Sequence, residues 1–380
     1  MNKNHVCLCG PRPKSAVSGL SLAVELLITG LEERSIPHTV IDAAYGGDVN
    51  NAGSFSLKRA FETALVILKV WRHLPKCDVY YATLSTSTFG FLRDFSTGLV
   101  AKALRKRVVF HLHGGGFESF YEKQNILLKW LIRLLYANVD TVVVLGELLK
   151  EQFFCLGDNI RQKLVVVPNG LTLGVSDPGS IVRTTKKRVE LLYMSSLMPS
   201  KGFKLVLDAV ANLTRDEKDT VHLSLCGSFV TATTENDCPI YDEQSLEKYV
   251  EHNSLSNNVT YHGQVLDSEK HRRFMDADIF ILPTSYPWEG QPLSIIEAMA
   301  YSLPVISCRH KGIPELVDDK VTGCFVRQND SDAIADAVRS IVSNSEIYES
   351  MAVNARVKFK NYFTRGAHMN AILNVIHNEL

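Results

Sequence analysis

Residues 279–300 read IFILPTSYPWEGQPLSIIEAMA, which combines an apolar strand, a turn and the start of a helix in one run. The strand is predicted at Ile279–Leu282, and the turn that follows it contains Pro283 and Pro287. Pro292 is expected at the first position of the helix, where its missing N–H costs nothing. A strand that leads through a short turn into a helix is the repeating unit of a parallel α/β sheet.

The same alternation of short apolar runs and longer amphipathic runs extends over most of the chain, whose 380 residues predict about two domains. The predicted strands are His5–Cys9, His38–Ile41, Asp78–Tyr81, Val108–His111, Thr141–Leu145, Leu164–Val167, Val189–Met194, Val221–Cys226, Val259–Tyr261, Ile279–Leu282, Val305–Ser307 and Cys324–Val326. The predicted helices include Gly19–Glu33, Leu57–His73, Phe89–Leu104, Ile126–Ala137, Glu147–Leu156, Asp332–Val342, Ile347–Phe359 and Ala367–Glu379. This pattern predicts two Rossmann-like domains with parallel sheets that face each other across a deep cleft.

The domain boundary is expected in a polar stretch that follows Pro168-Asn169-Gly170 and continues to Lys187. We therefore predict an N-terminal domain over residues 1–175 and a C-terminal domain over residues 176–362. Ligands of open parallel sheets lie beyond the carboxyl ends of the strands, so the chemistry is expected in the strand-to-helix loops.

The formal net charge is zero, which gives no indication of nucleic-acid binding. The first 150 residues hold 18 Lys and Arg against 12 Asp and Glu, and the remainder holds 23 against 29. A basic first half would attract a phosphate-bearing acceptor or an anionic membrane face. Scattered, solvated surface charge explains the same numbers, and both interpretations stay open.

The eight cysteines show neither a disulfide framework nor the spacing of a zinc site. The start of the chain lacks the apolar region of a signal peptide, and no uncharged stretch of about 18 residues is present. We therefore expect a cytoplasmic protein, either free or at the inner face of the cell membrane.

The turn and helix start at residues 288–300 contain the strongest candidate site. Gly290 allows the backbone to approach a ligand closely. The amides of Gln291, Leu293 and Ser294 are expected to point out of the helix start, where the helix dipole favours a phosphate. Glu289 and Glu297 flank this start, and carboxylates readily accept hydrogen bonds from sugar and ribose hydroxyls. Alternatively, Glu289 only caps the helix and Glu297 only faces solvent, and neither binds a ligand.

A second candidate segment, Tyr193–Gly202, begins the second series of strands. Lys201 stands at an expected helix start, where its charge would add to the helix dipole in binding a diphosphate. Taken alone, Lys201-Gly202 would be an ordinary surface loop.

The third candidate segment, Phe110–Phe117, ends a strand of the first domain with Gly114, Gly115 and Gly116. His111 and His113 are two positions apart, so they lie on the same side of the strand. His111 fits a core position, whereas His113 is the candidate for the reaction site.

These segments resemble family 4 of the retaining glycosyltransferases, which has the GT-B fold, an E-x7-E motif and members in bacterial polysaccharide and lipopolysaccharide synthesis. The resemblance covers most of residues 105–330. The roles that it implies are donor-sugar contacts by Glu289, Gly290, Gln291 and Pro292, diphosphate contacts by Lys201, Ser196, Leu293 and Ser294, ribose contacts by Glu297, and a catalytic positioning role for Glu289 and His113. Ser196 replaces the arginine usual in the family, and Arg309 or Lys311 is a candidate for the second charge.

The resemblance also implies further sites. The loops with Cys226, Gly227, His262 and Val265 would hold the nucleotide base, and the loop with Ser18 and Gly19 would lie beside the acceptor. The last helix, at about residues 363–380, would cross back to the first domain. The fold normally uses no metal, and no cofactor is expected.

The predicted reaction transfers a sugar from a nucleotide-diphosphate donor, with UDP-sugars favoured over GDP-sugars, to a hydroxyl of a saccharide or polyprenyl-linked saccharide. A nucleotide-sugar epimerase or hydrolase and a non-catalytic nucleotide-sugar-binding subunit are the alternatives. An NAD dehydrogenase is disfavoured, because Gly10-Pro11-Arg12-Pro13 follows the first strand in place of GxGxxG.

The basic helix Lys123–Arg133 has two competing interpretations. Its Lys, Arg and Trp130 indicate peripheral contact with an anionic membrane that presents the acceptor. Alternatively, Trp130 and the neighbouring Leu and Ile residues belong to the core.

Overall fold

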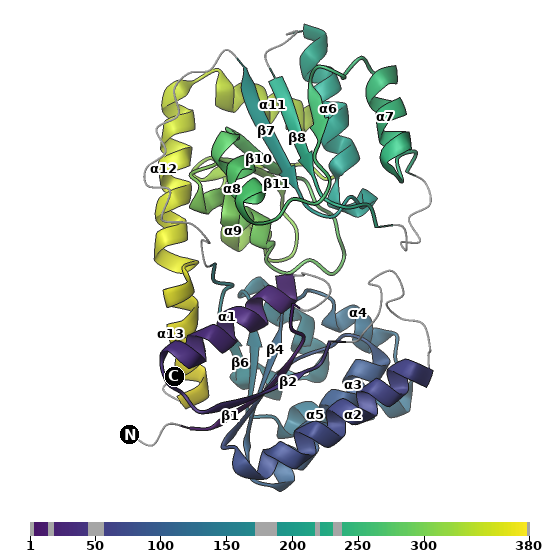
Figure 1. The fold of residues 1–380 in the computed structure, drawn as a ribbon, viewed down its shortest axis with the longest axis vertical. Helices are drawn as coiled ribbons and strands as arrows, with labels where there is room; N and C mark the ends of the chain where they lie inside the picture. Colours follow the sequence, from purple (N-terminus) through teal and green to yellow (C-terminus); the bar gives the residue numbers. More distant parts are fainter. Residues whose placement is uncertain are drawn as a thin grey trace. The chain divides into compact units, whose positions relative to one another are not determined.

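The computed structural model describes residues 4–13, 19–44, 57–171, 188–216, 221–230 and 238–377. The chain divides into an N-terminal unit, residues 1–170 with 364–380, and a C-terminal unit, residues 171–363. The boundary that we expect after residue 175 falls within 172–187, outside the described residues. Each unit is built on a six-stranded parallel sheet with helices packed against it (Figure 1).

The N-terminal unit has its strands in the order β2-β1-β3-β4-β5-β6, and every pair is parallel. The strands are β1 Val6–Gly10, β2 His38–Asp42, β3 Val79–Thr83, β4 Arg107–Leu112, β5 Thr141–Val144 and β6 Leu164–Val166. β1, β3 and β5 are buried along their whole length. Helices cover both faces of such a sheet, so its strands are continuous apolar runs without polar alternation.

Two groups of helices cover the two faces of this sheet. The helices are α1 Gly19–Glu33, α2 Leu57–His73, α3 Thr88–Ala103, α4 Phe117–Glu122, α5 Ile126–Asn138 and α13 Arg365–His377. α1 and α13 pack with Val6 and Leu8 on one face, whereas α2 to α5 pack with Cys7 and Cys9 on the other. Successive strand residues therefore contribute to opposite cores.

The helix predicted at Glu147–Leu156 is wrong in type, because Leu148–Leu156 is a 3-10 segment. Its Gln152 side chain is buried, accepts a hydrogen bond from Phe117 N at 2.9 Å and donates one to Gly114 O at 3.2 Å. Phe153 stacks on Phe117 with ring centroids 4.2 Å apart. These tertiary contacts, which the local sequence does not reveal, accompany the tighter winding.

The C-terminal unit repeats the architecture with the parallel strand order β12-β11-β10-β7-β8-β9. Its strands are β7 Val189–Met194, β8 Val221–Cys226, β9 Val259–Tyr261, β10 Ile279–Leu282, β11 Val305–Cys308 and β12 Gly323–Val326. Its helices are α6 Phe203–Asp216, α7 Glu243–His252, α8 Asp267–Asp276, α9 Leu293–Ala300, α10 Ile313–Leu316, α11 Ser331–Val342 and α12 Ser345–Tyr362. β7 to β10 have the predicted bounds, since each is a short apolar run between polar turns.

The expected position of Pro292 is wrong by one residue. It is the N-cap of α9, with φ −59° and ψ 119°, and Leu293 is the first helical residue. The fixed φ of proline suits both positions, and its ψ is extended here. Among the described helices, none combines the length and the hydrophobicity that a membrane span requires.

Candidate active site

The loops that follow β7 and β10 are joined at the carboxyl edge of the C-terminal sheet. Ser285 N donates to Ser200 O at 2.7 Å, and Thr284 Oγ1 contacts the same oxygen at 3.3 Å. β7 and β10 are neighbours in a parallel sheet, so the loops leaving them emerge side by side. The second and first candidate segments of the sequence therefore form one site.

Lys201 and Glu289 form the charged centre of this site. Lys201 Nζ lies 2.6 Å from Glu289 Oε2, which also accepts a hydrogen bond from Thr284 Oγ1 at 3.1 Å. The two charged side chains are only 13% and 8% exposed, and the Lys201 ammonium lies 4.4 Å from the centroid of the Tyr286 ring. Glu289 is thus held by a cation and a hydroxyl instead of capping a helix or facing solvent.

The backbone geometry at Gly202 requires a glycine after Lys201. Its φ is +79°, and a Cβ at this position would lie 2.6 Å from Pro283 O. The residue therefore permits both a left-handed turn and the close approach of the two loops.

The start of α9 presents backbone amides beside Glu289. Gly290, Gln291 and Pro292 are buried, whereas Leu293 and Ser294 are half-buried in the first helical turn. The first amides of a helix have no partner within the helix, which makes them suitable for a phosphate or hydroxyl ligand.

Glu297 lies in the second turn of α9 and forms a short ion pair with Lys270 of α8. Burial raises the pKa of the Glu297 carboxyl, and Lys270 opposes this shift. The sequence reasoning identified Glu297 but missed Lys270, because nothing in the local pattern connects residues on two different helices.

The predicted base-binding loops follow β8 and β9 at the same edge. Gly227 N donates to Gly263 O at 2.8 Å, and Tyr261 OH donates to Gly227 O at 3.0 Å. Gly227 has φ +145°, and a Cβ there would lie 1.8 Å from Ser195 O. This close approach joins the base loop to the loop of β7.

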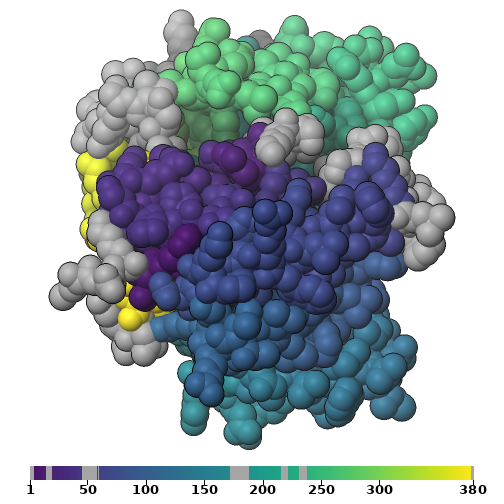
Figure 2. All heavy atoms as spheres, turned by 60° about the horizontal axis from the view of Figure 1, so that its bottom comes forward, coloured from purple at the N-terminus to yellow at the C-terminus, as the bar shows by residue number. Residues whose placement is uncertain are grey.

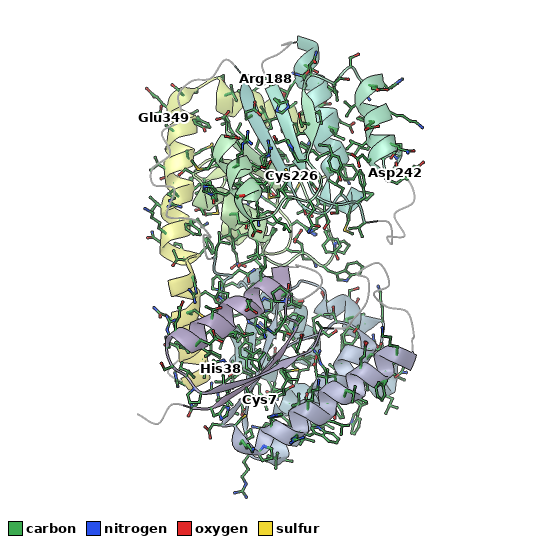
Figure 3. The ribbon with its side chains drawn as sticks, viewed as in Figure 1. Cys7, His38, Arg188, Cys226, Asp242 and Glu349 are labelled. Carbon is green, nitrogen blue, oxygen red and sulfur yellow. The ribbon has the colours of Figure 1, made fainter. Side chains whose placement is uncertain are left out.

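The structure corrects the prediction that the side chain of Cys226 helps to bind the base. The Cys226 side chain, at the end of β8 in Figure 3, is fully buried in the core, and burial raises the pKa of its thiol to about 12. Cys226 therefore offers only its backbone to a ligand. The His262 imidazole lies 3.3 Å from Ser224 Oγ, and burial lowers its pKa. Val265 packs, partly buried, against the core.

The spatial order of these loops matches the shape of a nucleotide sugar. The sheet order places the loops of β9 and β8, predicted to bind the base, first, the Lys201 loop of β7 next and the Glu289 loop of β10 last. Base, diphosphate and sugar follow one another in the same sequence along such a molecule.

Ser196, which stands where the family resemblance implies an arginine, is an exposed residue beside the Lys201 loop. The candidate replacement, Arg309, is engaged elsewhere: it pairs with Asp319 at 2.9 Å and lies 4.4 Å from the centroid of the Phe325 ring. Lys311 stands in a left-handed turn with φ 50°.

The N-terminal unit gathers three histidines at the end of β4. The rings of His111 and His113 lie 3.8 Å apart, and His368 of α13 stacks 6.5 Å from His111. His111 is fully buried and hydrogen-bonds Tyr81 OH at 2.5 Å, as expected of a core position. Within the described residues, no three or more His, Cys, Asp or Glu side chains form a group that could hold a metal ion.

His113 lies among these rings as a neutral imidazole. Burial, reinforced by the neighbouring His368, lowers its pKa to about 3. A neutral imidazole donates one hydrogen bond and accepts another, so it can orient a ligand hydroxyl. Of the predicted acceptor loop, Ser18 lies outside the described residues, and Gly19 begins α1.

Comparison with known proteins identifies similar chains. Residues 181–358 match the family described as Glycosyl transferases group 1. A glycosyltransferase of Methanocaldococcus jannaschii is 23% identical over 313 residues, 78% of this chain and 75% of that protein. The putative colanic acid biosynthesis glycosyltransferase WcaL of Escherichia coli is 37% identical over 179 residues, 46% of this chain and 41% of that protein.

Solved structures extend the similarity over the whole fold. Anabaena HepE in complex with UDP-glucose superposes with a TM-score of 0.70 at 18% identity, covering 99% of this chain and all of that chain. The lipopolysaccharide outer core galactosyltransferase WaaB gives the same TM-score at 17% identity and the same coverage. These structures show that the fold is GT-B. The family match and the sequence relatives show that the class of protein is a glycosyltransferase. Its group 1 domain occupies residues 181–358.

Proposed function

We propose that this chain is a retaining glycosyltransferase of family 4. It transfers a sugar from a UDP-sugar to a hydroxyl of a saccharide or lipid-linked saccharide in cell-surface polysaccharide synthesis. The observation that supports this most is the buried pair of Lys201 and Glu289, formed where the predicted phosphate and sugar loops meet.

The donor binds to the C-terminal unit in this proposal. Glu289, Gly290, Gln291 and Pro292 hold the sugar, and Glu297 holds the ribose. Lys201, Ser196 and the amides of Leu293 and Ser294 neutralise the diphosphate as it leaves, which is the main electrostatic task of the reaction. Gly227, His262 and Val265, together with the backbone of Cys226, line the base.

The acceptor binds to the N-terminal unit, and its hydroxyl attacks the anomeric carbon on the face from which the diphosphate departs. The bond between that carbon and the phosphate oxygen breaks, the new glycosidic bond forms, and the acceptor proton moves to the leaving phosphate. His113 orients the reacting groups without taking the proton. The protein contributes positioning and electrostatics, with no metal or cofactor.

Two features of the relatives support the details. HepE has been solved with UDP, with UDP and glucose, and with UDP-glucose, which favours a UDP-sugar donor. WcaL and AmsK carry the names of colanic acid and amylovoran biosynthesis, which favours a saccharide acceptor.

A donor screen tests this function. The protein is incubated with UDP-sugars and GDP-sugars, with and without a polyprenyl-linked saccharide, and the released nucleotide and product are measured. We expect rapid release only with acceptor, and an anomeric NMR signal that retains the donor configuration. Rapid hydrolysis or epimerisation without acceptor would favour the alternative enzymes, and binding without turnover on any acceptor would favour a non-catalytic subunit.

Exposed apolar side chains on the N-terminal unit support a lipid-linked acceptor. Ile126 is 88% exposed and Trp130 is 58% exposed, so the core interpretation is wrong for these two residues. It is correct for Ile132, which is fully buried, and for Leu128 and Leu131, which pack against the core. α2 adds an exposed stripe at helical spacing, formed by Phe61, Leu65, Leu68 and Trp71. α3 contacts both α2 and α5, and the outer side of α2 lies open in Figure 2.

The charge around these side chains favours an anionic bilayer as the partner. α2 carries four Lys and Arg residues against one acidic residue, Glu62, and Lys129 and Arg133 flank Trp130. Apolar side chains among lysines and arginines suit the interface of an anionic membrane. We propose that this face rests on the membrane that carries the acceptor.

Vesicle flotation tests the membrane contact. The wild type should float with vesicles of phosphatidylglycerol and phosphatidylcholine but not with phosphatidylcholine alone, and Leu68→Glu with Trp130→Glu should abolish flotation. Val353→Glu, at an exposed position of α12, is the matched control and should float normally. Self-association of the wild type that the double variant loses, without flotation, would assign the face to a second copy of the chain.

A further inference from the structure

Glu297 and Lys270 are brought together only by the fold. Glu297 lies on α9 and Lys270 lies on α8, 27 positions earlier, and Lys270 Nζ forms a short ion pair with Glu297 Oε1. The carboxylate is 12% exposed and the ammonium 28% exposed, so the pair lies mostly out of water. Such a pair is costly to break, because the remaining charge stays buried without compensation.

The surroundings make Glu297 dependent on this lysine. The Tyr301 phenol, one turn further along, carries no charge, because burial and the Glu297 carboxylate raise its pKa to about 12. His271 Nδ1 faces the Tyr301 hydroxyl at 2.5 Å, and the Arg356 guanidinium donates to Ala300 O. Within the described parts of the chain, Lys270 is the only cation in direct contact with Glu297.

We propose that Lys270 is a positioning residue for nucleoside recognition: it holds Glu297 as an oriented carboxylate that accepts hydrogen bonds from the ribose diol of the donor. This inference rests on the proposed function, in which Glu297 holds the ribose. Lys270 engages Oε1, which leaves Oε2 for the ligand. An ionised carboxylate is an acceptor only, whereas a protonated one carries a donor that opposes a hydroxyl donor.

The experiment compares two probes, UDP and 2′,3′-dideoxy-UDP, by calorimetric titration of the full chain. Lys270→Met should weaken the binding of UDP about tenfold and the binding of the dideoxy probe less than about twofold. The dideoxy probe lacks the ribose hydroxyls that donate hydrogen bonds to Glu297. Lys270→Arg should restore most of the affinity for UDP. Lys358→Met removes another ion pair of the same unit, with Asp318, and should bind both probes like the wild type.

Two further readouts separate a positioning role from a merely structural one. Adding Lys270→Met to Glu297→Ala should cause no further loss, because the lysine acts through the carboxylate. In Lys270→Met the preference for UDP over the dideoxy probe should increase with rising pH as Glu297 ionises, whereas the wild-type preference should change little, and the ratio of the two affinities cancels the ionisation of the diphosphate that both probes carry. Donor KM should rise in Lys270→Met more than kcat falls.

The outcomes distinguish this inference from the function on which it rests. An equal loss of both probes would show that Lys270 acts on the diphosphate or on folding, and would overturn the inference. A wild-type preference for UDP that Lys270→Met leaves unchanged would also overturn it, while ribose recognition would stand. A wild type that binds neither these probes nor their guanosine counterparts would refute the proposed function itself, and the inference with it.

Discussion

Lys201 Nζ and Glu289 Oε2 are 2.6 Å apart, although 88 positions separate the two residues in the sequence. The pair joins the loop expected to bind phosphate to the loop expected to bind sugar. A bound diphosphate would share the lysine with the carboxylate, and the lysine would then connect the leaving group to the residue that holds the sugar. This arrangement predicts distinct effects for the two residues.

Replacing Glu289 by Ala should lower kcat about a hundredfold, because the donor sugar would lose the group that orients it. Lys201→Ala should raise the donor KM about tenfold and also lower kcat about tenfold, because the ammonium contacts the diphosphate both in the bound donor and as it leaves. Steady-state kinetics with the donor and acceptor found in the screen measure both effects.

Lys204→Ala is the control for these kinetics, since Lys204 pairs with Asp208 one turn along α6 and should leave both constants unchanged. Near-normal turnover of Glu289→Ala with the true acceptor would remove the proposed role of this residue.

Gly227→Ala should destabilise the C-terminal unit by about 3 kcal/mol, because the Cβ would collide with Ser195 O in a backbone conformation already unfavourable for alanine. Gly263→Ala is matched to it: φ is +63° and no atom lies within 4 Å of the added carbon, so we expect about 1 kcal/mol. Urea unfolding measures both, and equal losses would show that backbone strain alone accounts for Gly227.

The N-terminal unit should lose stability in mild acid. Burial lowers the pKa of His111, His113 and His368, so all three are neutral when folded. In the unfolded chain they titrate near 6.5. Below that pH the unfolded state binds more protons, so the histidine contribution is complete above about 6.5 and falls as the pH drops.

His368→Gln tests this dependence. Urea unfolding between pH 7 and pH 5 gives the free energy of unfolding as a function of pH. In the variant, the slope of this dependence should be smaller by up to about 1.4 kcal/mol per pH unit. Asp94, whose pKa burial raises, gives the opposite trend but contributes equally to both proteins. Identical slopes would mean that His368 binds its proton in the folded state.

Arg93→Met should lower the free energy of unfolding by about 3–5 kcal/mol, because it leaves the Asp94 carboxylate buried without its cation. The two side chains lie 2.7 Å apart in the core. Arg93 also donates a hydrogen bond to Thr83 O at the end of β3, and Asp94 accepts one from Ser85 N in the loop that follows. Lys102→Met breaks the partly exposed pair with Asp140 and should cost at most about 1 kcal/mol. Chemical denaturation measures the loss of stability in both variants. Similar losses would contradict the claim that breaking a buried ion pair costs more than breaking a partly exposed one.

The strands were predictable because each is a short apolar run between polar turns, and their bounds are correct to within one or two residues. The 3-10 segment Leu148–Leu156 was not predictable, since it depends on Gln152 bonding to residues some 35 positions away. The core interpretation of Trp130 was wrong for a related reason. An apolar side chain on a helix faces the core or solvent according to the packing of its neighbours, which periodicity alone does not determine.

Local chemistry and spacing were enough to predict the alternation of strands and helices, the glycines at the turns and the two glutamates that flank the start of α9. The folded chain was needed to show that Lys201 meets Glu289, that Lys270 meets Glu297, that His368 joins His111 and His113, and that α2 leaves an apolar stripe exposed. These contacts depend on the order of the strands in each sheet, which brings together side chains that no short stretch of sequence contains.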